Sequence, residues 1–431
     1  MENESAGGSL RIEEVEVRDS RILIFRFSAS SNVRRYLHSD CFYVKYDEPI
    51  QDVPVSMLSI PGVAGLITLC WVTNSDLYVD ELDSRYLESM EAVRGVLNRF
   101  YPGIGFQGEV ICEERVDNSF GNRGLGLLFS GGVDSTALYI KHRRVKPTLF
   151  TIIGGVIPPR NRGFTDRFKR TYREFADSEG VRIHFIETNI RRVLNESLLW
   201  SENRVHLERP WWEMVNMGII YLGLVSPVTT RGIGRLLIAS SGSYRSRKPY
   251  GSHPLLDNSI GWGDVEVFHD LREYNREEKI THLIKRLVEE GNAPALQVCN
   301  YTPRISDGLN CSTCGDCACT IAGLLAANID PTRCGFQIRR DIYTKTKEYV
   351  KRSTLIKVWR NIQKEIDLEC NDFHQNSEDF LRWLKKADLE AINKPPEGID
   401  LERILLPLQA KLPRVVQDKI LETYYSWRYG E

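Results

Sequence analysis

The chain lacks a surplus of charge of either sign. Its 57 lysine and arginine residues and 58 acidic residues give a formal net charge of −1 over 431 residues. A protein that coats nucleic acid needs a strong basic excess, so a large nucleic-acid partner is not expected. Hydrophobic residues make up 42% of the chain, which is enough for a buried core and excludes global disorder.

Long hydrophobic runs and a secretion signal are also missing. The longest apolar stretch, Val55–Val72, contains Pro61 and two glycines. It is shorter than the roughly 20 residues that a membrane-spanning helix needs, so it is expected to be a buried element. The N-terminal sequence MENESAGG is acidic and has no basic-then-apolar pattern. These features predict a cytoplasmic protein with no membrane partner.

Changes in periodicity divide the chain into four parts. They are a disordered N-terminus (1–9), an α+β domain (10–118), an α/β domain (119–335) and a charged helical region (336–431). In the α+β part, Arg21–Phe27 alternates as a strand does, and Ser84–Phe100 has apolar residues at helical spacing. The last part is predicted to form helices over 341–365, 377–392 and 401–427.

Strands and helices alternate in the third part. The expected strands are Leu125–Phe129, Thr148–Ile153, Val181–Ile186 and Arg235–Ser240, and the expected helices are Thr136–Arg143, Phe164–Ser178 and Trp211–Val225. This order predicts an α/β fold, a parallel sheet with helices on both faces. Ligands of such sheets bind beyond the carboxyl ends of the strands.

A glycine-rich segment joins the first of these strands to its helix. Its residues are Ser130, Gly131, Gly132, Val133, Asp134 and Ser135. The glycines allow a tight turn and let backbone N–H groups approach a ligand closely. The N-terminus of the following helix favours anions, so a di- or triphosphate is the expected ligand. No lysine follows, which excludes the other common phosphate loop. A turn that merely connects strand to helix is the alternative.

Most cysteines lie in one short window near the end of the α/β part. The spacing Cys299-x11-Cys311-x2-Cys314-x2-Cys317 predicts a four-thiolate zinc site. Such a site has no open coordination position, so its role would be structural. An iron–sulfur cluster and free thiols are the alternatives. Cys319 and Cys334 are left over and are expected to be buried free thiols.

Together the two motifs resemble those of a known enzyme family. The sequence Ser-Gly-Gly-Val-Asp-Ser at a strand-to-helix turn is similar to the signature of the PP-loop ATP pyrophosphatases. Its combination with the four cysteines resembles the 7-cyano-7-deazaguanine synthase (QueC) family, over about Leu125–Leu325. The resemblance implies a PP-loop (HUP-like) fold and catalytic roles for Ser130, Asp134 and Ser135. It also implies that backbone groups near Ile152, Ile153 and Gly154 read adenine.

The resemblance implies a reaction and its cofactors. ATP and Mg²⁺ would serve to adenylate a deazaguanine carboxylate with loss of pyrophosphate, ammonia would convert the acyl-adenylate to an amide, and a second adenylation, of the amide, would lead to the nitrile. The chain has additional segments at both ends that the compact QueC family does not have, and in this it looks like the larger QueC-like proteins of anti-phage operons. That likeness implies an operon partner whose protein amine is the acceptor. The additional segments could also form a homodimer or shield the sheet.

The loop after the fourth strand departs from the family's Gly-Tyr-Pro-Asp-Cys-Arg-like stretch. Its basic residues could hold pyrophosphate or a carboxylate, or could form a solvated loop. They are Arg245, Arg247, Lys248 and His253. Arg276 and Lys279 could reach the phosphates or lie on a solvated helix face. His269 has no visible partner in the sequence and is expected to be a core or surface residue.

Three functions are therefore open. The first is ATP-dependent adenylation of a small carboxylate, followed by attack of ammonia or of a protein amine. The second is tRNA thiolation by a PP-loop enzyme, which needs Cys319 or Cys334 as its persulfide carrier. The third is a nucleotide-dependent binding module that does not turn over.

Overall fold

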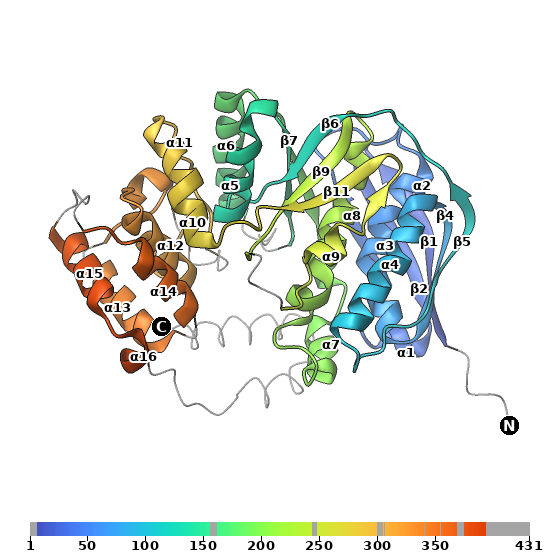
Figure 1. The fold of residues 1–431 in the computed structure, drawn as a ribbon. Helices are drawn as coiled ribbons and strands as arrows, with labels where there is room; N and C mark the ends of the chain where they lie inside the picture. Colours follow the sequence, from blue (N-terminus) through green and yellow to red (C-terminus); the bar gives the residue numbers. More distant parts are fainter. Residues whose placement is uncertain are drawn as a thin grey trace.

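One large, mostly parallel sheet between layers of helices forms the centre of the molecule (Figure 1). The computed structural model describes residues 7–155, 162–243, 248–299, 305, 307–339, 341–353, 355–368 and 375–393. The architecture is α/β and compatible with a Rossmann-like fold, as the alternation of strands and helices predicts. The predicted helix at 401–427 lies outside the described residues.

The strands are β1 (Gly8–Arg18), β2 (Ile22–Ala29), β3 (Cys41–Lys45), β4 (Ser75–Asp83), β5 (Val110–Val116), β6 (Gly124–Leu128), β7 (Thr148–Ile153), β8 (Ile183–Thr188), β9 (Ile233–Ala239), β10 (Gly261–Trp262) and β11 (Val265–Asp270). They lie in the order β10-β11-β9-β6-β7-β8-β3-β2-β1-β4-β5. Gly8 and Ser9, predicted to be disordered, instead belong to β1, because they pair with β4.

The α-helices before Cys299 are α1 (Ser31–Arg34), α2 (Val55–Leu58), α3 (Ile60–Val72), α4 (Ser84–Phe100), α5 (Val133–His142), α6 (Arg162–Glu179), α7 (Glu196–Asn203), α8 (Met217–Thr229), α9 (Pro254–Asp257), α10 (Arg276–Lys279) and α11 (Lys285–Glu289). Two π-helical segments, Trp212–Asn216 and Ile280–Ile284, precede α8 and α11. The first of them interrupts the single helix predicted at Trp211–Val225.

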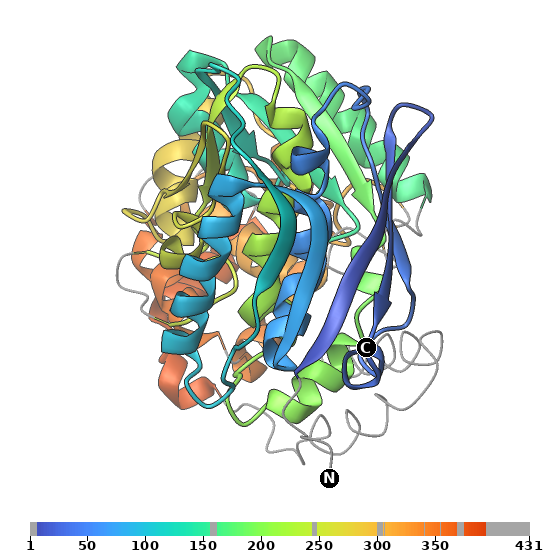
Figure 2. The same cartoon turned by 90° about the vertical axis from the view of Figure 1, so that its right-hand side faces the viewer.

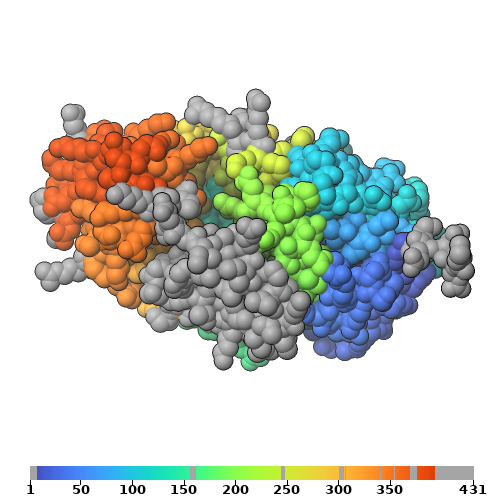
Figure 3. Space-filling model, turned by 90° about the horizontal axis from the view of Figure 1, so that it is seen from below, coloured from blue at the N-terminus to red at the C-terminus, as the bar shows by residue number. Residues whose placement is uncertain are grey.

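The remaining helices are α12 (Gly315–Ala326), α13 (Ile342–Arg352), α14 (Ile356–Glu365), α15 (Gln375–Lys386) and α16 (Leu389–Ile392). The last four confirm the prediction of a helical region after Cys334. α13, α14 and α15 pack against α12, and α16 packs against α13 and α14. Figure 3 shows these helices (orange to red) at the opposite end of the molecule from the N-terminal strands (blue). Among the described residues, no helix is both long and apolar enough to span a membrane.

The order in which successive strands join the sheet reverses at β6. The chain passes from β6 to β7 and β8 on one side, and then returns to place β9 on the other side of β6. All of these neighbours are parallel. In an open α/β sheet, the crevice at such a reversal is where ligands bind. The Ser130–Ser135 loop follows β6 and therefore lies at this point.

The N-terminal strands extend the same sheet. β3 pairs antiparallel with β8 through Val44↔Thr188 and Lys45↔Glu187. Figure 2 looks onto these N-terminal strands (blue), which stand in front of the rest of the molecule. The sheet is thus continuous across the predicted division at residue 118, although the chain does change its strand pattern there.

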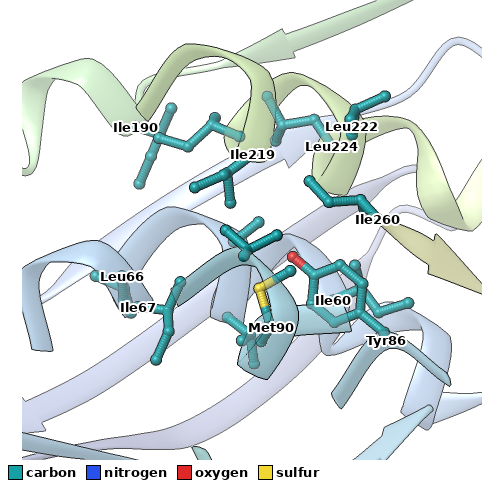
Figure 4. Packing of buried hydrophobic residues seen from close by; sticks show 14 of the residues in the cluster. Ile60, Leu66, Ile67, Tyr86, Met90, Ile190, Ile219, Leu222, Leu224 and Ile260 are labelled. Atoms are coloured by element: carbon teal, nitrogen blue, oxygen red, sulfur yellow. The ribbon is translucent and has the colours of Figure 1, made fainter. Parts of the chain in front are cut away.

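The hydrophobic core is divided by the faces of the sheet, because neighbouring residues of a strand point to opposite sides. Leu128 contributes to a cluster that also contains α3, α4 and α8, whereas Leu127 contributes to a cluster with α5, α6 and the C-terminal helices. Figure 4 shows the first cluster, in which Ile67 of α3 and Met90 of α4 face Ile219 of α8. The segment Val55–Val72 is buried there, as predicted, except at its ends, where Val55 is exposed and Val72 is partly buried.

A helix pair in this cluster gives a test of its packing. A Cβ at Gly223 of α8 would lie 2.2 Å from the Cβ of Ala64 in α3, whereas a Cβ at Gly95 of α4 would meet nothing within 4 Å. We expect Gly223→Ala to lower the free energy of unfolding by about 1–3 kcal/mol through overpacking. Gly95→Ala should raise it by up to about 1 kcal/mol through helix propensity. Urea denaturation of both variants measures the difference, and equal effects would contradict the close packing of α3 on α8.

Candidate functional site

The Ser130–Ser135 loop is held in shape by its own hydroxyl groups. The backbone N–H of Ser130 donates to Oγ of Ser135 (3.2 Å), and that hydroxyl lies 3.2 Å from the carbonyl of Gly132, to which it donates. Ser135 is buried, so its side chain shapes the loop from inside. Ser130 is exposed, and its hydroxyl lies at the mouth of the turn. Of the two predicted hydroxyl donors, only Ser130 is therefore open to a ligand.

Gly131 needs to be glycine for two reasons. Its φ of 72° lies in the left-handed region, and a Cβ there would be 1.8 Å from the hydroxyl of Tyr172 in α6. That hydroxyl bonds the carbonyl of Ala295 (2.9 Å) and lies 3.3 Å from the carbonyl of Gly131. Gly132 is the N-cap of α5 and has no side-chain cap. The loop therefore presents backbone at the positive end of a ten-residue helix, as phosphate sites do.

Asp134 pairs with a fully buried lysine. Nζ of Lys279 lies 2.8 Å from Oδ1 of Asp134 and also donates to the carbonyl of Ser240, at the end of β9. The Lys279 side chain is 0% exposed, and Arg276 lies 3.7 Å from the other oxygen of Asp134. A buried ammonium is costly unless it is paired, so this contact fixes α10 against the loop. Two cations thus lie beside the loop, which is where Arg276 and Lys279 would have to be in order to reach phosphates bound there.

The end of β7 lies next to the loop. Thr151 donates its hydroxyl to the carbonyl of Phe129 (2.6 Å), and Ile153 and Gly154 complete the strand end. The side chain of Ile153 is buried in the core, so only its backbone is available to a ligand. Gly154 has φ 108°, and a Cβ there would lie 1.9 Å from the carbonyl of Thr188. The structure thus brings the residues predicted to read adenine to the loop, with their backbone as the available part.

Of the four basic residues predicted after β9 to hold pyrophosphate or a carboxylate, the structure describes Lys248 and His253. Arg245 and Arg247 lie outside the described residues. Lys248 is exposed and pairs with Glu208 (2.7 Å). His253 is the N-cap of α9, and burial lowers its pKa to about 4, with Arg272 adding to the effect. His253 is therefore neutral near pH 7 and is not a phosphate-binding cation.

The four predicted metal ligands come together. The Sγ atoms of Cys299, Cys311, Cys314 and Cys317 all lie within 4.8 Å of one another. Cys311 and Cys317 are separated by 3.9 Å and Cys314 and Cys299 by 3.8 Å. Four thiolates in a tetrahedron around zinc, with Zn–S bonds of about 2.3 Å, have sulfur atoms about 3.8 Å apart. The group could therefore hold a metal ion such as zinc, and its four thiolates leave no position for a substrate.

Backbone contacts prepare these thiols for a metal. The N–H of Cys314 lies 3.3 Å from Sγ of Cys311, an N–H···S bond of the kind that supports a metal-bound thiolate. Asn310 accepts bonds from the N–H groups of Val298 (2.9 Å) and Cys299 (3.3 Å), so it joins the distant ligand to the other three. Hydrogen bonds with the Cys299, Cys314 and Cys317 thiols lower the pKa of Cys311. Hydrogen bonds with the other three thiols of the group raise the pKa of Cys317.

A short segment connects the metal ligands to the loop. The N–H of Gln297 donates to the carbonyl of Gly131 (2.8 Å), and its side-chain amide donates to the carbonyl of Cys299 (2.6 Å). Gln297 and Tyr172 therefore both contact the backbone carbonyl of Gly131 in the loop. No motif marks either residue in the sequence, because the glutamine lies more than 160 positions after the loop.

The two remaining cysteines of the window are buried. Cys319 lies within α12, where burial raises its pKa. Burial also raises the pKa of Cys334 to about 12. Both thiols are protonated near pH 7 and are poor nucleophiles. This agrees with the prediction of buried free thiols.

Comparison of the chain with protein-family models, with curated proteins and with solved structures found no match.

Removal of one thiolate tests the metal centre. We expect the purified protein to contain about one zinc ion per chain, and Cys314→Ser to lose it, because three thiolates bind zinc much more weakly than four. The variant should also unfold at lower temperature. Cys319→Ser changes a buried thiol five residues away in the sequence and should keep the metal. Elemental analysis measures the metal content of both variants, and full metal content in Cys314→Ser would contradict the assignment. Iron with visible absorption would indicate an iron–sulfur cluster instead.

Proposed function

We propose that the chain is a PP-loop ATP pyrophosphatase that adenylates a small carboxylic acid. The observation that carries the proposal is the Ser130–Ser135 loop at the switch point of the sheet, with Lys279 and Arg276 beside Asp134. Backbone N–H groups at a helix N-terminus would hold the phosphates, and the two cations would stabilise the charge that develops on the leaving pyrophosphate. The likeness of the motif to the PP-loop signature supports the same reading.

The reaction needs positioning more than acid–base chemistry. A carboxylate oxygen attacks the α-phosphorus of ATP, the bond from this phosphorus to the α–β bridging oxygen breaks, and pyrophosphate leaves with the electron pair. Mg²⁺, when bound, would neutralise the phosphate oxygens, and Asp134 is the carboxylate of the loop that could hold it. An amine then attacks the acyl carbon and expels AMP, and the amine loses a proton.

A deazaguanine-type acid is the first candidate substrate. The four-cysteine group and the loop support it, because this combination resembles the QueC family. The segments before β6 and after α12 are additional to that compact family. They would bind the protein whose amine is the acceptor, as in the larger QueC-like proteins of anti-phage operons. The zinc would have a structural role, since its four thiolates leave no open position.

The thiolation alternative is disfavoured by the two spare cysteines. A persulfide carrier has to be an accessible thiol with a low pKa, and Cys319 and Cys334 are buried with raised pKa values. A binding module without turnover would keep both the loop and the Lys279–Asp134 pair, and it differs from the proposed enzyme in binding ATP without forming AMP.

Loss of the open hydroxyl tests the loop. With 7-carboxy-7-deazaguanine, ATP, Mg²⁺ and ammonia, we expect the wild-type protein to form AMP. Ser130→Ala and Asp134→Ala should reduce its rate by about 10²–10³-fold, the usual effect of losing one transition-state contact. Ser178→Ala, at the exposed end of α6, is the matched control and should leave the rate unchanged. AMP is measured by mass spectrometry, and a Ser130→Ala variant with normal turnover would refute the site.

Replacement of the two cations tests how pyrophosphate is stabilised. We expect Lys279→Met to lower the rate of AMP formation by about 10²–10³-fold and Arg276→Met by less, because Arg276 is farther from Asp134. Circular dichroism shows whether Lys279→Met still folds, and Arg276 is partly exposed, so its variant tests the idea without that risk. Arg286→Met, exposed after the π-helical segment, is the control. Wild-type rates in both variants would overturn the role of these cations.

A further inference from the structure

A helix of the C-terminal region, α14, contacts the element that carries the two cations. Nδ2 of Asn361 in α14 donates a hydrogen bond to Oε2 of Glu277 in α10 (3.2 Å). Glu277 is only 4% exposed. Burial raises the pKa of its carboxyl group, whereas hydrogen bonds from its own backbone N–H and from Asn361 lower it. A buried carboxylate is costly unless it has such partners, so this bond helps to fix how α10 lies.

Packing fixes α14 at this place. Its residues Trp359 and Ile362 have no exposed surface and belong to the same hydrophobic cluster as Ile280, the first residue after α10. α14 also packs directly against α10 and α12, and Figure 1 shows the three helices together, away from the N-terminal strands. Asn361, between the two apolar residues in the sequence, is partly buried. Its amide is therefore held at a defined position from which it can bind α10.

α10 has only four residues, so few contacts decide how it is turned about its axis. Arg276 and Lys279 are three positions apart and share one face of the helix, and they lie 3.7 Å and 2.8 Å from Asp134. Glu277 lies about 100° farther round the axis than Arg276, and it is this neighbouring face that α14 holds. Nη2 of Arg276 also donates to the hydroxyl of Thr320 in α12 (3.1 Å). A rotation of α10 that followed loss of the bond to α14 would therefore carry both cations away from the loop.

We infer that Asn361 is a positioning residue, which acts through Glu277 to turn α10 so that its two cations face the pyrophosphate that leaves from ATP. The inference rests on the proposed function for the identity of that leaving group. It gives part of the C-terminal region a role in the nucleotide site, although this region is far from the loop in the sequence. Asn361 acts through α10 and is not itself a ligand of the phosphates.

Hydrogen exchange tests the positioning role without any ligand. The amide of Lys279 donates to the carbonyl of Asn275 within the turn of α10. We expect Asn361→Leu to speed the exchange of this amide by about tenfold, because α10 loses one of its anchors. Asn393→Leu is the matched control, since the side-chain amide of Asn393 also donates within the C-terminal region, to two backbone carbonyls. The control should leave the Lys279 amide unchanged, and equal exchange rates in Asn361→Leu and the wild type would overturn the inference.

Ligand binding tests whether the orientation of α10 matters for the phosphates. Isothermal titration calorimetry measures the affinity for pyrophosphate with Mg²⁺ and, separately, the affinity for AMP, which lacks the phosphates that leave. We expect Asn361→Leu to weaken pyrophosphate binding by about tenfold, as when one charge-assisted contact is lost, and to change AMP binding by less than about twofold. Asn393→Leu should bind both ligands as the wild type does. Equal loss of both affinities in Asn361→Leu would indicate general damage and overturn the positioning role, as would an unchanged affinity for pyrophosphate.

A donor–acceptor exchange covers the case in which Asn361→Leu does not fold. Asn361→Asp is isosteric and places a second carboxylate against Glu277, so it should weaken pyrophosphate binding at least as much. Adding Glu277→Gln rebuilds the hydrogen bond in the opposite direction and should restore the affinity to within about threefold of the wild type. A double variant as weak as Asn361→Asp would overturn the role of this contact. A wild-type protein that binds neither pyrophosphate nor AMP would instead overturn the proposed function, and the exchange experiment would then decide the positioning role alone.

Discussion

The contact between Lys279 and Asp134 is the constraint on which the arrangement of the site depends. A lysine with no exposed surface needs a partner, and it has two, the carboxylate after β6 and the carbonyl of Ser240 after β9. These are the two strands between which the order of the sheet reverses. One ammonium therefore joins the two edges of the crevice and brings α10 to it.

The sheet explains how such a crevice is supported. Because β3 continues the sheet beyond β8, the N-terminal strands and α3 and α4 cover the face on which α8 lies, while α5, α6 and the C-terminal helices cover the other. Each face of the central strands thus has a core built from distant parts of the chain. The N-terminal segment is in this sense part of the scaffold of the site, since it holds α8 and the π-helical turn in place.

The sequence was informative where function depends on neighbouring residues. The Ser130–Ser135 loop and the four cysteines could be predicted because turn geometry and ligand spacing are local, and α4 and β7 have the predicted bounds because their apolar periodicity is regular. The pairing of Asp134 with Lys279, 145 positions away, could not be predicted, since charged residues are common on helix surfaces. The partner of His269 was missed although Asp257 is only 12 positions away, because a turn and β10 lie between them. The extent of the sheet was missed because the β3–β8 pairing involves only two residue pairs.

The four-cysteine group and the loop are joined by direct hydrogen bonds. Gln297 donates its backbone N–H to the carbonyl of Gly131 and its side-chain amide to the carbonyl of Cys299, so the chain that supplies the first thiolate also forms the back of the loop. Metal binding in a four-thiolate site contributes directly to folding free energy, because the ligands are brought together only in the folded state. Part of that free energy would be available to keep Gly131 in its left-handed conformation and its backbone turned toward a ligand. A metal held by these four thiolates, two residues from such a contact, would therefore add to the rigidity of the loop as well as to the stability of the chain.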